Sequence, residues 1–115
     1  MRILVIDDEE LVRIVLEEKL RAAGCQVAFA RTGKEGLDQL QAGSFDCVIT
    51  DLRMPGITGT EVLQWVREHQ SEVDVIVLTG HGEVEPAVQA MKAGAWDFLV
   101  KEIPFDGSQV TAAVA

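Results

Sequence analysis

The chain has 115 residues, of which 48% are hydrophobic and 25% are charged, so it fits one globular domain and is too short for two. Its formal net charge is −9, which argues against direct nucleic-acid contact by this domain, because cationic contacts with phosphates dominate such binding. We see neither a secretory leader nor an apolar run near the roughly 20 residues of a membrane span, and therefore expect a cytoplasmic protein that does not contact the membrane.

The first half of the chain alternates strand and helix signals. Residues 3–6 are apolar and β-branched and predict a strand. A helix is predicted next, because its apolar residues recur at helical spacing: Val12, Val15, Leu16 and Leu20. A second strand is predicted at residues 26–30, and a third at residues 47–50. The helix between them is expected to begin with a capping box of Thr32 and Glu35.

The second half continues the alternation. A capping box of Thr58 and Glu61 predicts the start of a third helix, and residues 73–78 predict the fourth strand. The fourth helix carries Pro86 in its first turn and an apolar stripe that we expect to be buried, made of Val84, Ala87, Val88 and Met91. A fifth strand follows at residues 96–100, and a short last helix is expected at about 106–114.

The element order predicts the fold class. Five strand–helix alternations with short, right-handed connections favour an α/β sandwich around a parallel five-stranded sheet. The first, third and fourth strands are nearly continuously apolar, which is typical of a sheet covered by helices on both faces. Helix ends are expected at Gly24, Gly43 and Gly94. Cys25 and Cys47 lack metal-ligand spacing and are expected to be free thiols in a reducing compartment.

Unusual polar residues occupy the carboxyl ends of four predicted strands. They are Asp7 and Asp8 after the first, Asp51 after the third, Thr79 after the fourth and Lys101 after the fifth. These strand ends form the ligand-binding crevice of an open parallel sheet. Three carboxylates gathered there repel one another unless a cation is present, and all-oxygen ligands favour Mg²⁺ or another hard cation. With Lys101 and Thr79 beside it, Asp51 is chemically suited to accept a phosphoryl group.

Each of these residues also has an ordinary interpretation. Asp8 could cap the first helix, and Asp51 could be a turn residue before Pro-Gly. Thr79 could simply end a strand, and Lys101 could be a solvated lysine at the sheet edge. Their joint placement at one edge of the sheet favours a shared site.

Four segments carry a resemblance to a known family. They are Ile-Leu-Val-Ile-Asp-Asp-Glu at 3–9, Asp-Cys-Val-Ile-Thr-Asp-Leu-Arg-Met-Pro-Gly at 46–56, Leu-Thr-Gly-His-Gly at 78–82 and Ala-Met-Lys-Ala-Gly-Ala-Trp-Asp-Phe-Leu-Val-Lys at 90–101. The chain resembles the receiver domains of bacterial two-component response regulators, in the CheY-like superfamily, and is most similar to receivers of the NtrC and DctD type. The resemblance covers residues 1–115 as one domain and places any output domain outside this chain.

The resemblance implies a flavodoxin-like fold with strand order 2-1-3-4-5 and a phosphorylation site. Asp51 would accept a phosphoryl group from a sensor histidine kinase, with Mg²⁺ or Mn²⁺ held by Asp7, Asp8, Asp51 and the backbone carbonyl of Arg53. Lys101 and Thr79 would bind the phosphoryl group.

The resemblance also implies a switch. Phe98 would follow Thr79 inward, although it could equally be an ordinary core aromatic. The face made by the fourth helix, fifth strand and fifth helix would then control an output domain, of a transcriptional kind, or support a homodimer. Such a domain phosphorylates and dephosphorylates itself but is not otherwise an enzyme.

The sequence departs from the family after Lys101. Receivers usually continue with a proline and an aromatic residue, whereas here Glu102 and Ile103 precede Pro104 and Phe105, which puts the docking of Lys101 in question. Arg53 and His81 flank the predicted site and are expected to influence the lifetime of the phosphate.

Three other functions compete with this interpretation. A hydrolase that uses an aspartyl phosphate is disfavoured, because Arg53 stands where such enzymes commonly have a second aspartate. A flavin- or nucleotide-binding module is disfavoured, because Asp-Asp-Glu-Glu rather than a glycine-rich loop follows the first strand. A receiver-like docking module without phosphorylation would leave the acidic residues idle.

Overall fold

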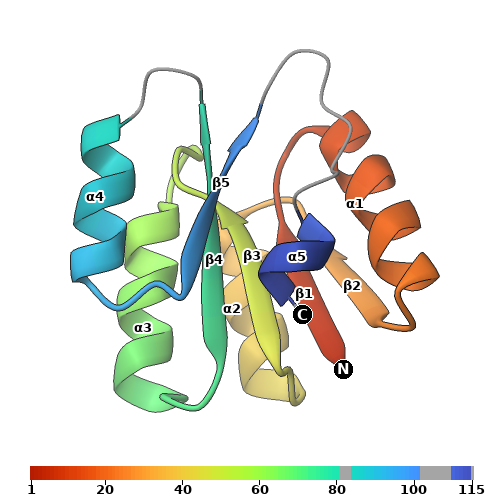
Figure 1. Ribbon diagram of the computed structural model, residues 1–115. Coiled ribbons are helices and arrows are strands. Elements are labelled where there is room, and N and C mark those ends of the chain that lie inside the picture. Colours follow the sequence, from red (N-terminus) through yellow and green to blue (C-terminus); the bar gives the residue numbers. More distant parts are fainter. Residues whose placement is uncertain (81–83, 102–109, 115) are drawn as a thin grey trace.

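Strands and helices alternate along the chain in the computed structural model, which describes residues 1–80, 84–101 and 110–114. The strands are β1 (Arg2–Ile6), β2 (Gln26–Ala30), β3 (Cys47–Asp51), β4 (Asp74–Gly80) and β5 (Asp97–Lys101). The helices are α1 (Glu10–Ala22), α2 (Gly33–Ala42), α3 (Gly59–His69), α4 (Val84–Lys92) and α5 (Val110–Val114). The strands form one parallel sheet of order β2-β1-β3-β4-β5, which confirms the predicted fold class (Figure 1).

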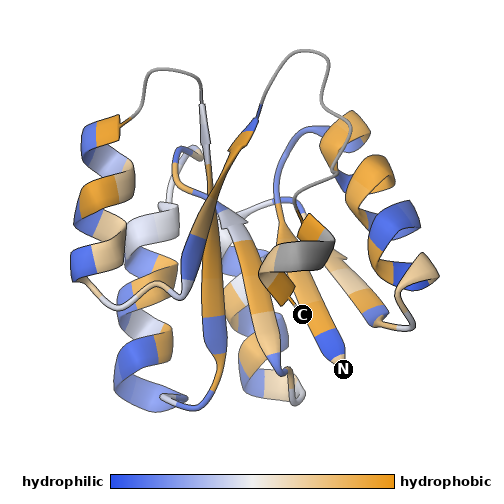
Figure 2. Cartoon of the chain, viewed as in Figure 1, coloured by the Kyte–Doolittle hydropathy of each residue, from blue (hydrophilic) through white to orange (hydrophobic). Residues whose placement is uncertain are grey.

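The sheet has a hydrophobic core on each face, and β1 shows why. Successive strand residues point to opposite faces, so Leu4 and Ile6 join one core while Ile3 and Val5 join the other. Helices α2, α3 and α4 cover the first core, and α1 and α5 cover the second (Figure 1). The continuous apolar runs predicted for a doubly covered sheet are therefore confirmed, and Figure 2 shows apolar residues concentrated along the central strands.

Strand boundaries differ slightly from the prediction. The fourth and fifth strands each begin one residue later than expected, and β4 continues through Gly80 while β5 continues through Lys101. Likewise Asp51 is the last residue of β3 rather than the first after it. Thr79 and Lys101 are therefore held by strand pairing, because both lie in the register of β4 with β5.

Helix caps follow the predicted chemistry with two differences. Thr58 and Glu61 form the complete capping box. The Thr32 hydroxyl accepts from the Glu35 backbone N–H, but the Glu35 carboxylate accepts from Arg31 N–H rather than from the N-cap, so the second box is only half formed. Asp8 does not cap α1: the N-cap is Glu9, and its side chain makes no capping hydrogen bond.

The predicted apolar stripe of α4 is wrong for three of its four residues. Ala87 is buried, but Val84, Val88 and Met91 are 72%, 40% and 39% exposed. The helix instead packs through Ala87 and Ala90, whose small side chains lie close against the sheet. Hydrophobic spacing could not distinguish these two overlapping faces, because both recur at helical period.

Gly24 and Gly94 have φ of +87° and +106°, the left-handed conformation expected after a helix end. Cys25 and Cys47 are free thiols, half-buried and buried respectively, as predicted.

The predicted last helix is present at α5, while residues 106–109 lie outside the described part. Within the described residues, no helix is both long and apolar enough to cross a bilayer.

Candidate phosphoryl and metal site

Parallel strands bring the predicted polar residues to one edge of the sheet. Asp7 follows β1 directly, Asp51 ends β3, Thr79 is the penultimate residue of β4 and Lys101 ends β5. All four strand ends lie at the upper edge in Figure 1. Asp7, Thr79 and Asp51 are 0%, 2% and 9% exposed, which is unusual for polar side chains and indicates that the fold holds them in place.

The ammonium group of Lys101 lies among three carboxylates. Its Nζ is 2.7 Å from Asp7 Oδ2, 2.8 Å from Asp51 Oδ2 and 2.9 Å from Glu9 Oε1. The lysine side chain is only 13% exposed, so the interpretation of Lys101 as a solvated edge residue is wrong. This arrangement links the ends of β1, β3 and β5 through charge.

Asp7 is held at each of its other polar groups as well. Its backbone N–H donates to the Ala30 carbonyl at 3.1 Å, and its carbonyl accepts from the Arg13 guanidinium at 2.9 Å. Its Oδ1 accepts from the Glu9 backbone N–H at 2.8 Å. Only Oδ2, fully buried, accepts no well-directed hydrogen bond within the described residues, although it faces the Lys101 ammonium.

Four acidic residues in this region fit a hard cation. Asp7, Asp8, Glu9 and Asp51 each offer a carboxylate oxygen, and these oxygens all lie within 4.8 Å of one another. Such an all-oxygen donor set matches Mg²⁺, and the incompletely satisfied Asp7 Oδ2 is an oxygen that a cation would stabilise. The Arg53 backbone N–H donates to Asp51 Oδ1 at 3.2 Å, which places the Arg53 peptide beside this group.

Burial and charge shift the pKa of two members of the site. Burial raises the pKa of Asp7 above its ordinary value of 3.8, and the contacts with Lys101 and the Glu9 backbone only partly offset this. Burial alone would lower the pKa of Lys101, but its contacts with Asp51, Asp7 and Glu9 outweigh burial and raise that pKa. The lysine therefore stays charged at neutral pH.

These features can be compared with known proteins. Residues 3–115 match the family described as response regulator receiver domain. The chain belongs to this family.

Receivers in the transcriptional regulators FixJ and DctD are similar to this one. FixJ of Bradyrhizobium diazoefficiens is 43% identical over 112 residues, which are 97% of this receiver and 54% of FixJ. DctD of Pseudomonas aeruginosa is 42% identical over 106 residues, which are 91% of this receiver and 23% of DctD. The receiver thus spans about half of one relative and about a quarter of the other.

Solved receiver structures share the fold. A receiver domain protein from Clostridium thermocellum superimposes with a TM-score of 0.88 at 36% identity, covering 98% of this chain and 90% of that one. TrrA from Thermotoga maritima, solved in complex with Mg²⁺-BeF, has a TM-score of 0.85 at 34% identity, covering 98% of this chain and 95% of that one.

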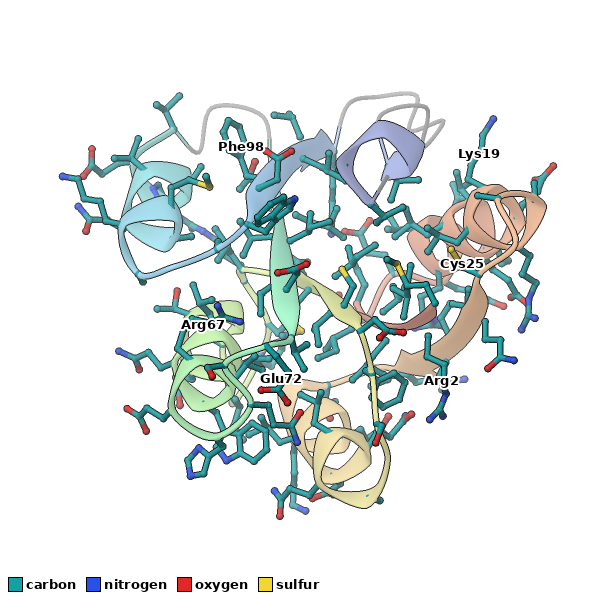
Figure 3. All side chains as sticks on the ribbon, turned by 60° about the horizontal axis from the view of Figure 1, so that its bottom comes forward. Arg2, Lys19, Cys25, Arg67, Glu72 and Phe98 are labelled. Carbon is teal, nitrogen blue, oxygen red and sulfur yellow. The ribbon has the colours of Figure 1, made fainter. Side chains whose placement is uncertain are left out.

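Thr79 and Phe98 lie on the α4 side of the receiver. The Thr79 hydroxyl donates a long hydrogen bond of 3.4 Å to the Leu99 carbonyl, so in this structure it is engaged with β5. Phe98 is 42% exposed rather than turned into the core, and Figure 3 shows its ring on the α4 side of β5. Both residues line a groove of about 410 Å³ together with Val84, Val88 and Met91.

Two residues of the site were not predicted. Glu9 lies within the family motif and Arg13 lies on the first helix, and the sequence pattern assigns neither a role in the site. Glu9 could have been suspected from its place after Asp-Asp, whereas the contact of Arg13 depends on how α1 packs. His81 and the segment after Lys101, residues 102–109, lie outside the described residues.

Proposed function

We propose that this receiver accepts a phosphoryl group on Asp51 from the phosphohistidine of a sensor histidine kinase. The observation that supports this most strongly is the position of Asp51: its carboxylate is nearly buried and lies 2.8 Å from the Lys101 ammonium, within an acidic group suited to a divalent cation. A carboxylate oxygen attacks phosphorus, the P–N bond breaks, and the imidazole leaves with the electron pair of that bond.

Asp7, Asp8, Asp51 and the Arg53 carbonyl would hold Mg²⁺ or Mn²⁺. When bound, the metal supplies positive charge that offsets the repulsion between Asp51 and the incoming phosphoryl oxygens. Lys101 is already in contact with Asp51, so its ammonium can pass from carboxylate to phosphoryl oxygens with little movement. Thr79 can supply a hydroxyl donor once it leaves its long hydrogen bond to Leu99.

The groove between α4 and β5 gives room for a conformational change after phosphorylation. When Thr79 turns toward the phosphoryl group, Phe98 can move into the groove that both residues line, and the exposed face of α4 changes with it. Such a change is a population shift, because the phosphorylated site must bind the active arrangement better than the resting one. That face would control a transcriptional output domain or pair with a second receiver.

The domain would act as a signalling module whose chemistry is limited to its own phosphorylation and dephosphorylation. The free thiols of Cys25 and Cys47 support a reducing compartment, the cytoplasm.

Beryllofluoride with Mg²⁺ mimics the acyl phosphate and tests this proposal. We expect it to bind the wild-type protein and to change amide hydrogen exchange in α4 and β5, and we expect Asp51→Asn to abolish both effects. Glu18→Gln, which removes an exposed acid from α1, is the matched control and should behave as wild type. Binding that survives in Asp51→Asn, or absence of binding to the wild type, would show that Asp51 is not the phosphoacceptor.

A further inference from the structure

The backbone carbonyl of Asp7 lies beyond the last residue pair of its strand. The register of β1 ends at Ile6 opposite Ala30 in β2 and opposite Thr50 in β3. The Asp7 N–H still reaches the Ala30 carbonyl, but the Asp7 carbonyl is past both ladders. Because a buried carbonyl without a donor is costly, the end of β1 depends on a donor from elsewhere.

Arg13 supplies that donor from the first turns of α1. Its guanidinium donates to the Asp7 carbonyl at 2.9 Å, and its backbone N–H donates to the Glu9 carbonyl at 3.2 Å. Arg13 is therefore attached to the residues on both sides of Asp8. Arg13 thus joins the two ends of the acidic turn of Asp7, Asp8 and Glu9, which the Ala30 carbonyl and Lys101 also hold.

We propose that Arg13 is a positioning residue for the metal-binding group of this receiver. By fixing the Asp7 carbonyl, it holds the buried Asp7 carboxylate against Lys101 and keeps Asp8 near Asp51. This inference rests on the proposed function, because it assigns Arg13 a role in binding the cation that phosphorylation of Asp51 requires. Mutation of a residue that orients metal ligands typically lowers metal affinity about 10- to 100-fold.

The charge of Arg13 and its positioning role predict opposite changes in Mg²⁺ affinity when the side chain is removed. A cationic side chain bonded to the Asp7 carbonyl, beside the acidic group, repels Mg²⁺, so loss of its charge alone should tighten Mg²⁺ binding. Loss of its hydrogen bond frees the acidic turn, which must then be ordered when the cation binds, and this should weaken binding. The sign of the change therefore separates a positioning role from a purely electrostatic one.

The test is calorimetric titration of the intact chain with Mg²⁺ alone. We expect Arg13→Met to weaken Mg²⁺ binding by roughly tenfold. Arg13→Lys, which keeps the charge and one N–H donor group, should recover part of that loss. The matched control is Arg21→Met, the same substitution at the other end of α1, where Arg21 pairs with Glu17 on the surface. It removes the same charge and should not weaken binding.

Folding is checked by circular dichroism before each titration. If Arg13→Met does not fold, Arg13→Gln is used instead, because it removes the same charge. Its Mg²⁺ affinity is compared with that of wild type in the same way. Mg²⁺ binding in the folded variant that equals or exceeds wild type overturns the positioning role. If Asp51→Asn nevertheless binds Mg²⁺ more weakly than wild type, the positioning role of Arg13 is refuted but the proposed function is not. Wild-type protein that binds no Mg²⁺ refutes both.

Discussion

The pKa values of three buried or partly buried side chains, Asp7, Lys101 and Cys47, are shifted by their surroundings. Asp7 and Lys101 share a contact of 2.7 Å, yet burial raises the pKa of the acid and the surrounding carboxylates raise that of the lysine. Cys47 is simpler, because its thiol is buried in the core and burial raises its pKa to about 12.

The pH dependence of stability tests the Cys47 environment. The unfolded chain loses the Cys47 proton near its ordinary pKa of 9.0, whereas the folded chain keeps it until about pH 12. The folded state therefore binds more protons in this window, and the free energy of unfolding should fall as pH rises, by at most about 1.4 kcal/mol per pH unit. Urea denaturation of wild type and Cys47→Ala from pH 8.5 to 10.5, under reducing conditions, measures this slope.

We expect a flatter slope for Cys47→Ala than for wild type. Cys25→Ala is the control, since it removes a half-buried thiol and leaves Cys47 in place. Equal slopes in wild type and Cys47→Ala would show that Cys47 does not cause the alkaline loss of stability.

At the scale of elements, the start of α3 lies very close to the end of β3. Gly59 begins this helix, and its N–H donates to the Leu52 carbonyl at 3.1 Å. A Cβ added at Gly59 would lie 2.1 Å from the Asp51 carbonyl oxygen and 2.7 Å from Leu52 Cα. Both contacts are with backbone, which cannot move aside as a flexible side chain could.

Gly59→Ala should therefore displace either α3 or the end of β3. We expect a loss of about 1–3 kcal/mol in the free energy of unfolding, typical of overpacking, together with weaker beryllofluoride binding at Asp51. The matched control is Gly43→Ala at the end of α2, where an added Cβ has ordinary contacts of 3.7 Å and more and φ is extended. Urea denaturation compares the two, and equal stabilities would contradict close packing at Gly59.

On the scale of the whole molecule, charge is distributed unevenly. The chain carries a net charge of −9, and four of its acids converge at one edge of the sheet, where Lys101 contacts three of them. The apolar side chains of α4 and β5 lie exposed along the neighbouring groove. The fold thus combines a site in which Lys101 offsets only part of the acidic charge with an exposed apolar face.

Mg²⁺ should stabilise the folded protein as a whole. A cation that binds only the native state at 100 times its Kd adds about 2.7 kcal/mol to the free energy of unfolding. For a domain of this size, this corresponds to a rise in Tm of roughly 11 °C. Thermal unfolding in MgCl₂ and in EDTA measures the shift.

The increase should be much smaller in Asp8→Asn and unchanged in Glu18→Gln, whose acid is exposed on α1. KCl at the same ionic strength distinguishes binding from screening. A full stabilisation by KCl, or by Mg²⁺ in Asp8→Asn, would mean that no specific cation site contributes.

Much of the molecule could be predicted from local sequence patterns. β-Branched apolar runs, helical spacing in α1 and the Thr58–Glu61 capping box each arise from neighbours in the chain, so they predicted the elements, and the strand–helix alternation predicted a parallel sheet. The strand order was implied by the resemblance to receiver domains. The edge of the sheet that gathers Asp7, Asp51, Thr79 and Lys101 follows from the same order, because parallel strands end on one side.

Other features were decided only by tertiary packing. Which face of α4 is buried and which atoms surround Lys101 both depend on partners distant in the sequence. The Glu35 carboxylate, by contrast, bonds a backbone N–H only four residues away, which the capping-box pattern does not indicate. The contact of Arg13 with Asp7 spans only six residues, but it depends on how α1 is placed against the end of β1, which helical spacing does not describe. Hydrophobic period and motif spacing describe one element at a time, whereas these contacts arise from the distances between elements.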